Sequence, residues 1–226
     1  MKKASKLFYE KQIKAIESQI AMIEQKTTAE IVPVIATKSS NYDDVAGLFS
    51  FAFSLFILTL YWLFLQFSPA SNAMWQEGFV LSFNLLSTLI VLIISYFVGN
   101  KVVLYLFGVK RLLLNQNRIN KEVQANAKMA FQRFRVMNTK DSVGVLVYVS
   151  LFEPLVHVLA NDAINQKIPQ QQWQSICDTI VTVFKTHQPF EGLTKGLKDI
   201  GDLLEEQFPA SRDNANEIPN KLNLID

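Results

Sequence analysis

Two aspartates are the residues of this sequence whose types and positions could support chemistry. Asp141 precedes the apolar run Val143–Val149, and Asp162 follows the run Leu155–Ala160. If these runs pair antiparallel around Glu153-Pro154, both carboxylates come to the same end of the sheet, where they could share Ca²⁺ or Mg²⁺ through their oxygens. The simpler interpretation is that both are solvated turn residues, because Asp is common in turns.

The histidines and the cysteine do not extend this pair into a catalytic constellation. His157 lies inside the second run and is interpreted as a packed or exposed strand residue. His187 precedes Gln188-Pro189, where we expect contact with a helix dipole. Cys177 is the one cysteine, which excludes an internal disulfide, and its apolar helical stripe predicts a buried structural thiol. The sequence has no zinc-ligand spacing, phosphate-binding glycine loop or serine nucleophile elbow.

The strands that must position these residues are predicted from apolar runs. Glu30–Ala36, Val143–Val149 and Leu155–Ala160 are each short and rich in branched residues, and the last two are expected to form a hairpin. The second run is apolar throughout, which is typical of a central strand covered on both faces. Pro33 cannot donate a ladder hydrogen bond, so the first strand is expected at an edge or with a bulge.

Helices are predicted where apolar residues recur at spacings of three and four. They cover Leu7–Lys26, a basic stretch after Val109, Pro169–Lys185 and the segment from Leu193 to Phe208. The alternation with strands implies a layered α/β fold. Residues 1–45 hold one helix and one strand and cannot bury their own stripe, so we expect them to fold with residues 110–208 as one domain. Residues 209–226 are predicted to be a flexible tail.

Two long apolar runs without charged residues separate the two parts of this domain. Ala46–Phe67 and Gly78–Asn100 hold 22 and 23 residues, and a helix needs about 20 to cross a membrane. Only ten residues separate them, so residues 46–109 are predicted to be a transmembrane hairpin. Neither run has an ionisable group, which favours an anchor over a channel. Asn84 and Ser87 are expected to hydrogen-bond between the helices or to their own backbone.

Basic residues around the hairpin predict its orientation and a lipid contact. The loop Ser68–Glu77 has no Lys or Arg, whereas Lys38 precedes the first run and a basic stretch follows the second. The positive-inside rule therefore places both termini in the cytoplasm, with two spans in the inner membrane. Aromatic residues of the basic stretch fall on its apolar stripe, which favours anionic lipid headgroups over nucleic acid. The residues expected to contact lipid are Lys110, Arg111, Arg118 and Lys121.

Five stretches, taken in order, resemble the TPM-domain family. They are AIESQIAMIEQKTTAEIVPVI (Ala15–Ile35), AKMAFQRFRVMNT (Ala127–Thr139), VGVLVYVS (Val143–Ser150), VHVLANDAINQKI (Val156–Ile168) and the run Phe190–Pro209. The chain also resembles the bacterial subgroup in which a transmembrane hairpin interrupts the domain. The resemblance implies an α-β-α sandwich. Many members are binding or assembly modules, while a plant member implies acid phosphatase activity with a metal-assisted site, onto which Asp162 is carried over.

The sequence therefore leaves two main functions open, beside a third, a regulator that reads lipid headgroups through Arg111, Arg118 and Lys121. The first interpretation is a membrane-anchored cytoplasmic α/β module of a bacterial inner membrane, which binds or assembles with a protein partner and contacts membrane lipid. This interpretation includes no nucleic-acid partner and assigns no definite cofactor. The alternative is a metal-dependent phosphatase that uses Asp141 and Asp162 with a divalent cation, Ca²⁺ or Mg²⁺.

Overall fold

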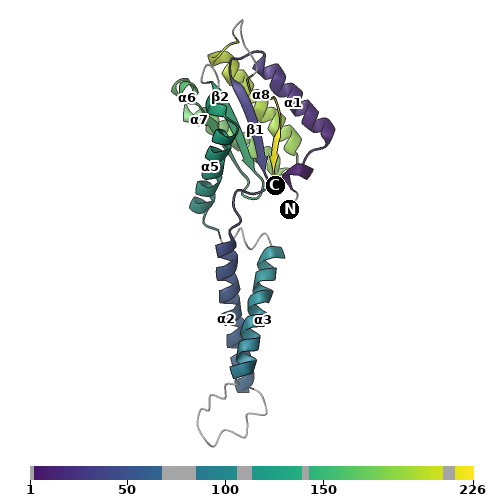
Figure 1. Cartoon of the computed structure of the whole chain (residues 1–226), viewed down its shortest axis with the longest axis vertical. Helices are drawn as coiled ribbons and strands as arrows, with labels where there is room; N and C mark the ends of the chain where they lie inside the picture. Colours follow the sequence, from purple (N-terminus) through teal and green to yellow (C-terminus); the bar gives the residue numbers. More distant parts are fainter. Residues whose placement is uncertain (1–2, 68–84, 106–113, 139–142, 211–216) are drawn as a thin grey trace, which may run out of the picture. The chain divides into compact units, whose positions relative to one another are not determined.

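The computed structural model describes residues 3–67, 85–105, 114–138, 143–210 and 217–226. The chain divides into two compact units (Figure 1): an α/β unit, built from Met1–Ser40 and Gln116–Asp226, and a helical unit, Asn41–Asn115. The α/β unit is therefore made from two stretches of chain that flank the helical unit in the sequence.

The α/β unit is built on a sheet of four strands in the order β3-β2-β1-β4. They are β1 (Glu30–Ala36), β2 (Gly144–Ser150), β3 (Leu155–Ala160) and β4 (Asn223–Ile225). β1 runs parallel to both β2 and β4, and β3 returns antiparallel to β2. The predicted mixed α/β fold and the β2–β3 hairpin are confirmed. β2 is buried along its whole length, as its continuous apolar run predicts.

β1 is an interior strand, so the edge position expected from Pro33 is wrong. Successive residues of a strand turn their backbone groups to alternate sides. The N–H of Thr37 points to the β4 side, where it donates to the carbonyl of Ile225, and Pro33 lies four residues earlier and faces the same side. β4 pairs only with the last three residues of β1. Pro33 therefore lies just before the first residue of β1 that pairs with β4. No described strand requires the N–H that proline lacks.

The end of the chain holds a strand where the sequence predicts a flexible tail. Leu222 is buried, Asn223–Ile225 pair with β1, and the Asp226 carboxylate accepts hydrogen bonds from Ser5 and Thr37 at 2.6 to 3.1 Å. A strand of three residues is too short to show a periodicity of its own. Its order comes from the open edge of β1, which is a long-range feature.

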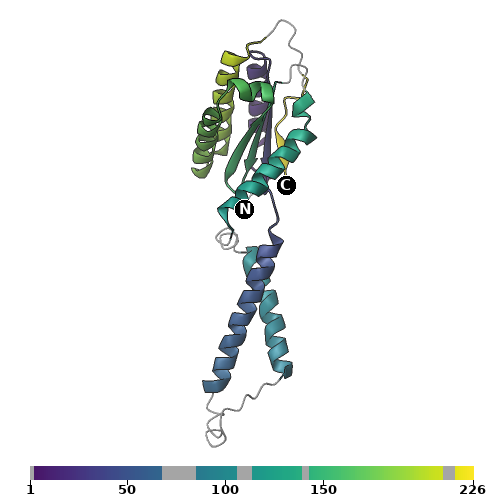
Figure 2. The ribbon, with the colours of Figure 1, turned by 90° about the vertical axis from the view of Figure 1, so that its left-hand side faces the viewer.

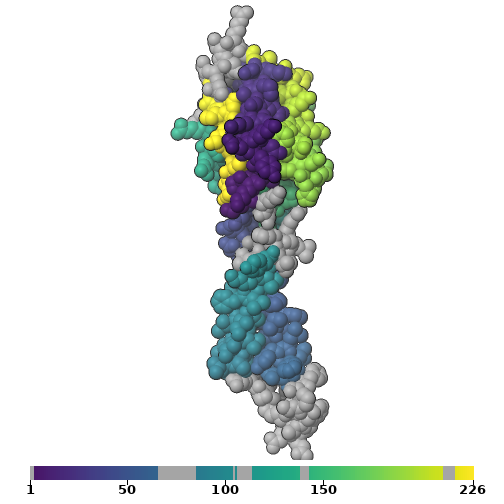
Figure 3. All heavy atoms as spheres, turned by 90° about the vertical axis from the view of Figure 1, so that its right-hand side faces the viewer, coloured from purple at the N-terminus to yellow at the C-terminus, as the bar shows by residue number. Residues whose placement is uncertain are grey.

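Helices cover both faces of the sheet. α1 (Glu10–Glu24), α7 (Gln170–Lys185) and α8 (Pro189–Gln207) lie on one face, and α5 (Gln116–Arg133) lies on the other against β2 and β3. Figure 2 shows the sheet between α5 and the α7–α8 pair, and Figure 3 shows α1 between α8 and the C-terminal segment. This is the predicted α-β-α sandwich. Its shorter elements are η1 (Ala4–Lys6), η3 (Val136–Asn138) and α6 (Asp162–Lys167).

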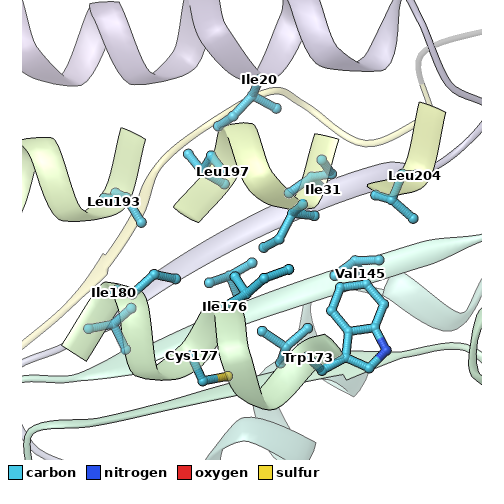
Figure 4. Packing of buried hydrophobic residues seen from close by; sticks show 14 of the residues in the cluster. Ile20, Ile31, Val145, Trp173, Ile176, Cys177, Ile180, Leu193, Leu197 and Leu204 are labelled. Atoms are coloured by element: carbon cyan, nitrogen blue, oxygen red, sulfur yellow. The ribbon is translucent and has the colours of Figure 1, made fainter. Parts of the chain in front are cut away.

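The main core lies between the sheet and α1, α7 and α8. Isoleucine and leucine side chains of these helices pack on β1 and β2, together with Trp173 and Cys177 of α7 (Figure 4). Gly196 of α8 lies directly against Ile180 of α7, and a Cβ at the glycine would overlap the isoleucine side chain. The glycine therefore permits the close approach of the two helices.

The helical unit consists of two apolar helices that pack against each other, α2 (Asp43–Phe67) and α3 (Leu85–Tyr105). Both are long and apolar enough to span a membrane. Their outward side chains are large and apolar, and more than half of each remains exposed at Phe51, Phe56, Phe64, Leu86 and Phe97. Exposed apolar surface of this extent is typical of contact with lipid or another protein.

Small and polar residues lie where α2 and α3 meet. A Cβ on Gly99 would come within 3.1 Å of the Ser50 Cα. The Tyr61 hydroxyl donates to Ser87 Oγ at 3.0 Å, which is the contact between helices expected of Ser87. Asn84 lies outside the described residues. Three buried serines donate to carbonyls of their own helices, and they are Ser50, Ser54 and Ser95.

Candidate binding site along the edge strand

β3 is an edge strand, and it is less covered than the two strands beside it. Every residue of β1 and β2 is buried, whereas five of the six residues of β3 are only partly buried. Within the described residues, β2 is the strand that pairs with β3, and the other side of β3 has none. Figure 2 looks toward this edge, which lies between α5 and α7. An exposed edge of this kind is a template for pairing with another chain.

The register of the hairpin decides which backbone groups of β3 point outward. The N–H of Asn161 donates to the carbonyl of Gly144. Residues alternate along an antiparallel ladder between those that bond to the neighbouring strand and those that do not. The odd-numbered residues of β3 therefore turn toward β2. The even-numbered residues direct their N–H and C=O groups away from it, and these are Val156, Val158 and Ala160.

A groove of about 280 Å³ lies along the outward side of β3. Residues of β3 from Leu155 to Val158 line it, and both neighbouring helices contribute walls. The wall side chains are mostly amides, and they are Asn120 and Gln124 of α5 and Gln170 and Gln174 of α7, with Lys121, Trp173 and Cys177 completing the lining. None of the described residues that line it is acidic. The groove therefore offers a backbone edge between polar walls with one positive charge.

Two reactive residue types that the sequence contains lie in this groove, His157 and Cys177. Burial raises the pKa of the Cys177 thiol to about 11, and a hydrogen bond from the Val158 backbone offsets only part of this rise. The thiol is therefore protonated at neutral pH, as predicted for a structural cysteine. Burial and the nearby Lys128 lower the pKa of His157, so its imidazole is neutral. Neither side chain is an activated nucleophile.

A larger cavity adjoins the groove at the start of β3. It measures about 720 Å³ and shares Leu155 and Val156 with the groove. Its lining comes from the start of α1, the turn between β2 and β3, and the turn between α7 and α8. Concave cavities with apolar walls are where proteins bind small molecules and partner side chains. Here the apolar lining includes Leu7, Leu151, Phe184 and Phe190.

One wall of this cavity is polar and comes from the turn between α7 and α8. Lys185, His187 and Gln188 line it. His187 has φ 62°, and its N–H donates to the carbonyl of Phe184 at 3.2 Å, so it ends α7 in a left-handed conformation. The predicted position of His187 at a helix end is confirmed. Its place in a cavity could not be predicted, because the sequence does not show that this turn meets the start of β3.

A buried polar cluster fixes the turn between β2 and β3. Glu153 is 3% exposed, and its carboxylate accepts hydrogen bonds from the Ser39 N–H at 3.0 and 3.2 Å and from the Ser150 hydroxyl. The Ser39 hydroxyl lies 3.2 Å from that of Tyr148 and donates to Ser150 Oγ. Burial raises the pKa of Tyr148. The cluster ties the chain after β1 to the turn after β2, and this turn is one wall of the larger cavity.

The structure places one of the two predicted metal-ligating residues. Asp162 is exposed in the first turn of α6, directly after β3, while Asp141 lies outside the described residues. Over the described ranges, no three His, Cys, Asp or Glu side chains are grouped to hold a metal ion. Asn161 is buried, and its Oδ1 has no hydrogen-bond partner in the part of the chain that is described. Asn161 and Asp162 are adjacent in the sequence, and each side chain carries an oxygen of a type that can bind a cation.

Two of the four residues predicted to contact lipid lie in the part of the chain that the structure describes. Arg118 and Lys121 lie on α5, and Lys121 lines the groove. Lys110 and Arg111 lie outside the described residues. Lys121 is therefore placed to contact a ligand in the groove as well as lipid.

Two buried glutamates were not anticipated from the sequence. Glu24 ends α1 and Glu30 starts β1, and both are less than 10% exposed. Burial raises the pKa of Glu24 to about 8 despite a hydrogen bond from the Ile31 N–H, and it also raises that of Glu30. Glu30 accepts hydrogen bonds from the N–H groups of Glu217 and Ile218. The hydrogen bonds of these two glutamates stabilise the segments around the amino end of β1, away from the β3 edge.

Comparison with known proteins gives a match to one family model over part of the chain, and a shared fold. Residues 109–203 match the model of the TPM domain, which confirms the family resemblance over that stretch. The NMR structure of the BA42 protein from the psychrophilic bacterium Bizionia argentinensis is similar, with a TM-score of 0.56 and 18% sequence identity over 96% of this chain and 94% of that one. At this identity the likeness shows a shared fold. The comparison with curated proteins gives no match.

Proposed function

We propose that this chain, which carries a TPM domain over residues 109–203, is a membrane-anchored binding module whose α/β unit holds a protein partner along β3. The observation that carries the proposal is that the groove and the larger cavity share Leu155 and Val156 on an exposed edge strand. Together they offer backbone groups, polar walls and an apolar recess. These are features of a binding surface, and the reactive side chains among them are a protonated thiol and a neutral imidazole.

The anchor in this proposal is the pair α2 and α3. Their length, apolar composition and exposed outward side chains support a bilayer position. The loop charges support a bacterial inner membrane with both termini in the cytoplasm. Arg118, with Lys110 and Arg111, is proposed to contact anionic headgroups, and no nucleic-acid partner is proposed. The binding surface would then operate within reach of other proteins of the same membrane.

Photo-crosslinking in intact membranes tests the proposal. A benzophenone amino acid replaces Leu155, which both cavities share. The matched control carries it at Met22, which is 58% exposed on α1. We expect a discrete adduct with one protein from position 155 and none from position 22. Equal labelling from both positions, or no adduct from position 155, would contradict a partner site at this edge.

A metal-dependent phosphatase is the alternative function, and one observation favours it. Asn161 Oδ1 is buried without a hydrogen-bond partner in the described residues, directly before the exposed Asp162. Carboxylate and amide oxygens are ligands that Ca²⁺ and Mg²⁺ accept, and a bound cation supplies charge that stabilises a phosphoryl group. Asp141 would be the third oxygen donor in this alternative.

Turnover of a generic phosphate ester separates the two functions. The binding-module proposal predicts no turnover by the purified full chain, with or without Mg²⁺ or Ca²⁺. The alternative predicts cation-dependent turnover that falls by at least about 100-fold in Asp162→Ala, because loss of a ligand removes the metal's stabilisation of the transition state. Asp178→Ala, on the exposed side of α7, is the control for loss of a carboxylate. Turnover that is lost only in Asp162→Ala would make the binding-module account incomplete.

A further inference from the structure

We infer that the partner supplies an extended acidic segment, which binds as an additional strand beside β3. This inference rests on the proposed function, and it specifies the chemistry of the partner at the same site. Extended peptides that add to an exposed sheet edge gain affinity from backbone hydrogen bonds and specificity from the flanking pockets. The backbone, the walls and the charge of the groove each favour this mode.

The backbone of β3 is suited to another strand. Val156 and Val158 direct their N–H and C=O groups away from β2, into the side of β3 where the groove lies. A backbone hydrogen bond from Val158 lowers the pKa of the Cys177 thiol, and a thiol is a weak acceptor. A carbonyl from an incoming strand is a stronger acceptor. Strand addition would therefore give the Val158 N–H a stronger hydrogen bond than the sulfur provides.

The ends of the groove define the length of β3 that is available. The carbonyl of Ala160 accepts a hydrogen bond from the Asn165 side chain at 2.8 Å, which occupies that end of the edge. At the other end, Leu155 and Val156 lead to the larger cavity. An incoming segment would therefore pair over Val156 and Val158 and continue into the apolar recess, where an aliphatic or aromatic side chain can be buried.

The walls supply partners for polar side chains of such a segment. Amide groups project from both α5 and α7 into the groove lining, and amides can donate and accept. Trp173 also lines the groove, and its indole Nε1 has no acceptor among the described residues. The Trp173 Nε1 is itself buried, so the amide walls are the groups that can bond to polar side chains of an incoming segment.

The charge of the groove selects an acidic segment and disfavours a second copy of this chain. Lys121 lines the groove, and Lys128 lies near enough to lower the pKa of His157. Asp178 of α7 accepts a hydrogen bond from Gln174, which lines the groove, and its charge adds to the raised pKa of Cys177. It offsets one of the two lysine charges, so one positive charge remains among these three residues. Pairing β3 with β3 of a second copy would bring the lysines of both copies together, and like charges at an interface oppose association.

Peptide selection on the full-length chain tests the inference. The chain is embedded in phosphatidylcholine nanodiscs, and a displayed library of random nine-residue peptides is the probe. We expect selected peptides to alternate apolar and other residues and to carry Asp or Glu. Lys121→Glu should weaken their binding by about tenfold or more. The control Lys198→Glu, an exposed charge reversal on α8, should not change it.

A second variant and hydrogen exchange test the strand geometry. Val156→Pro removes an N–H that does not bond to β2, which an edge strand tolerates, so peptide binding should be lost while the sheet is retained. Bound peptide should also slow amide exchange at Val156 and Val158. Unselective or basic peptides, unchanged binding in Lys121→Glu, or no peptide enriched over empty nanodiscs would overturn the inference. If adducts from position 155 persist in Val156→Pro and Lys121→Glu membranes, strand addition is wrong while the binding module stands.

Discussion

At the amino end of β1, Glu24 and Glu30 are both buried, and the pKa of Glu24 is raised first by burial and further by the charge of Glu30. A carboxyl group with a folded-state pKa near 8 and an unfolded value of 4.5 binds its proton more tightly in the folded chain. Stability therefore falls as the pH rises from about 4.5 to about 8, and the full penalty is present above pH 8.

Glu24→Gln should remove most of this dependence. The glutamine Oε1 can still accept the hydrogen bond from the Ile31 N–H, and it carries no charge to bury. We expect the variant to exceed the parent chain in free energy of unfolding by at least about 1 kcal/mol at pH 8, since one pKa unit corresponds to about 1.4 kcal/mol. Urea unfolding at pH 5, 6.5 and 8 measures it. Glu206→Gln, at an exposed site on α8, is the control, and parallel pH profiles for the parent and Glu24→Gln would contradict the expectation.

At the scale of the elements, α7 and α8 are held close by glycine. Gly196→Ala places a methyl group where the Ile180 side chain lies, and overpacking of a core costs about 1–3 kcal/mol. We expect faster hydrogen exchange at the amides of both helices. The control is Gly47→Ala in α2, where nothing lies within 4 Å of the added carbon. Unchanged exchange in Gly196→Ala would mean that the helices can separate at little cost.

The elements also show what the sequence could and could not predict. The strand β2 and its hairpin with β3 were predictable, because an apolar run and a short turn are local signals. The interior place of β1 was not, since it depends on which side of the strand Pro33 faces and on β4, a strand of three residues that is too short to detect from the sequence. The groove likewise could not be predicted. It exists because β1 and β4 occupy the other side of β2 and leave β3 at the edge.

At the scale of the whole molecule, the proposed anchor predicts where the ends of the chain lie. Short epitope tags at the N- and C-termini should both be protected from protease in intact spheroplasts and cleaved after permeabilisation. The loop charges are the physical reason, because Lys and Arg are retained on the cytoplasmic side. A tag within residues 68–77 should show the opposite protection pattern. Cleavage of either terminal tag in intact cells would contradict the orientation.

The order of the strands in the sheet has a consequence for biosynthesis. β1 pairs with β2, yet residues 37–143 lie between them in the sequence. A ribosome adds about 5–20 residues per second. On the order of 10 seconds therefore pass between the synthesis of β1 and that of β2, while the apolar helices are being made. During that interval an interior strand, buried at every position in the finished protein, has no sheet to join. The nascent N-terminal segment must therefore be kept from aggregating until translation has passed Ser150.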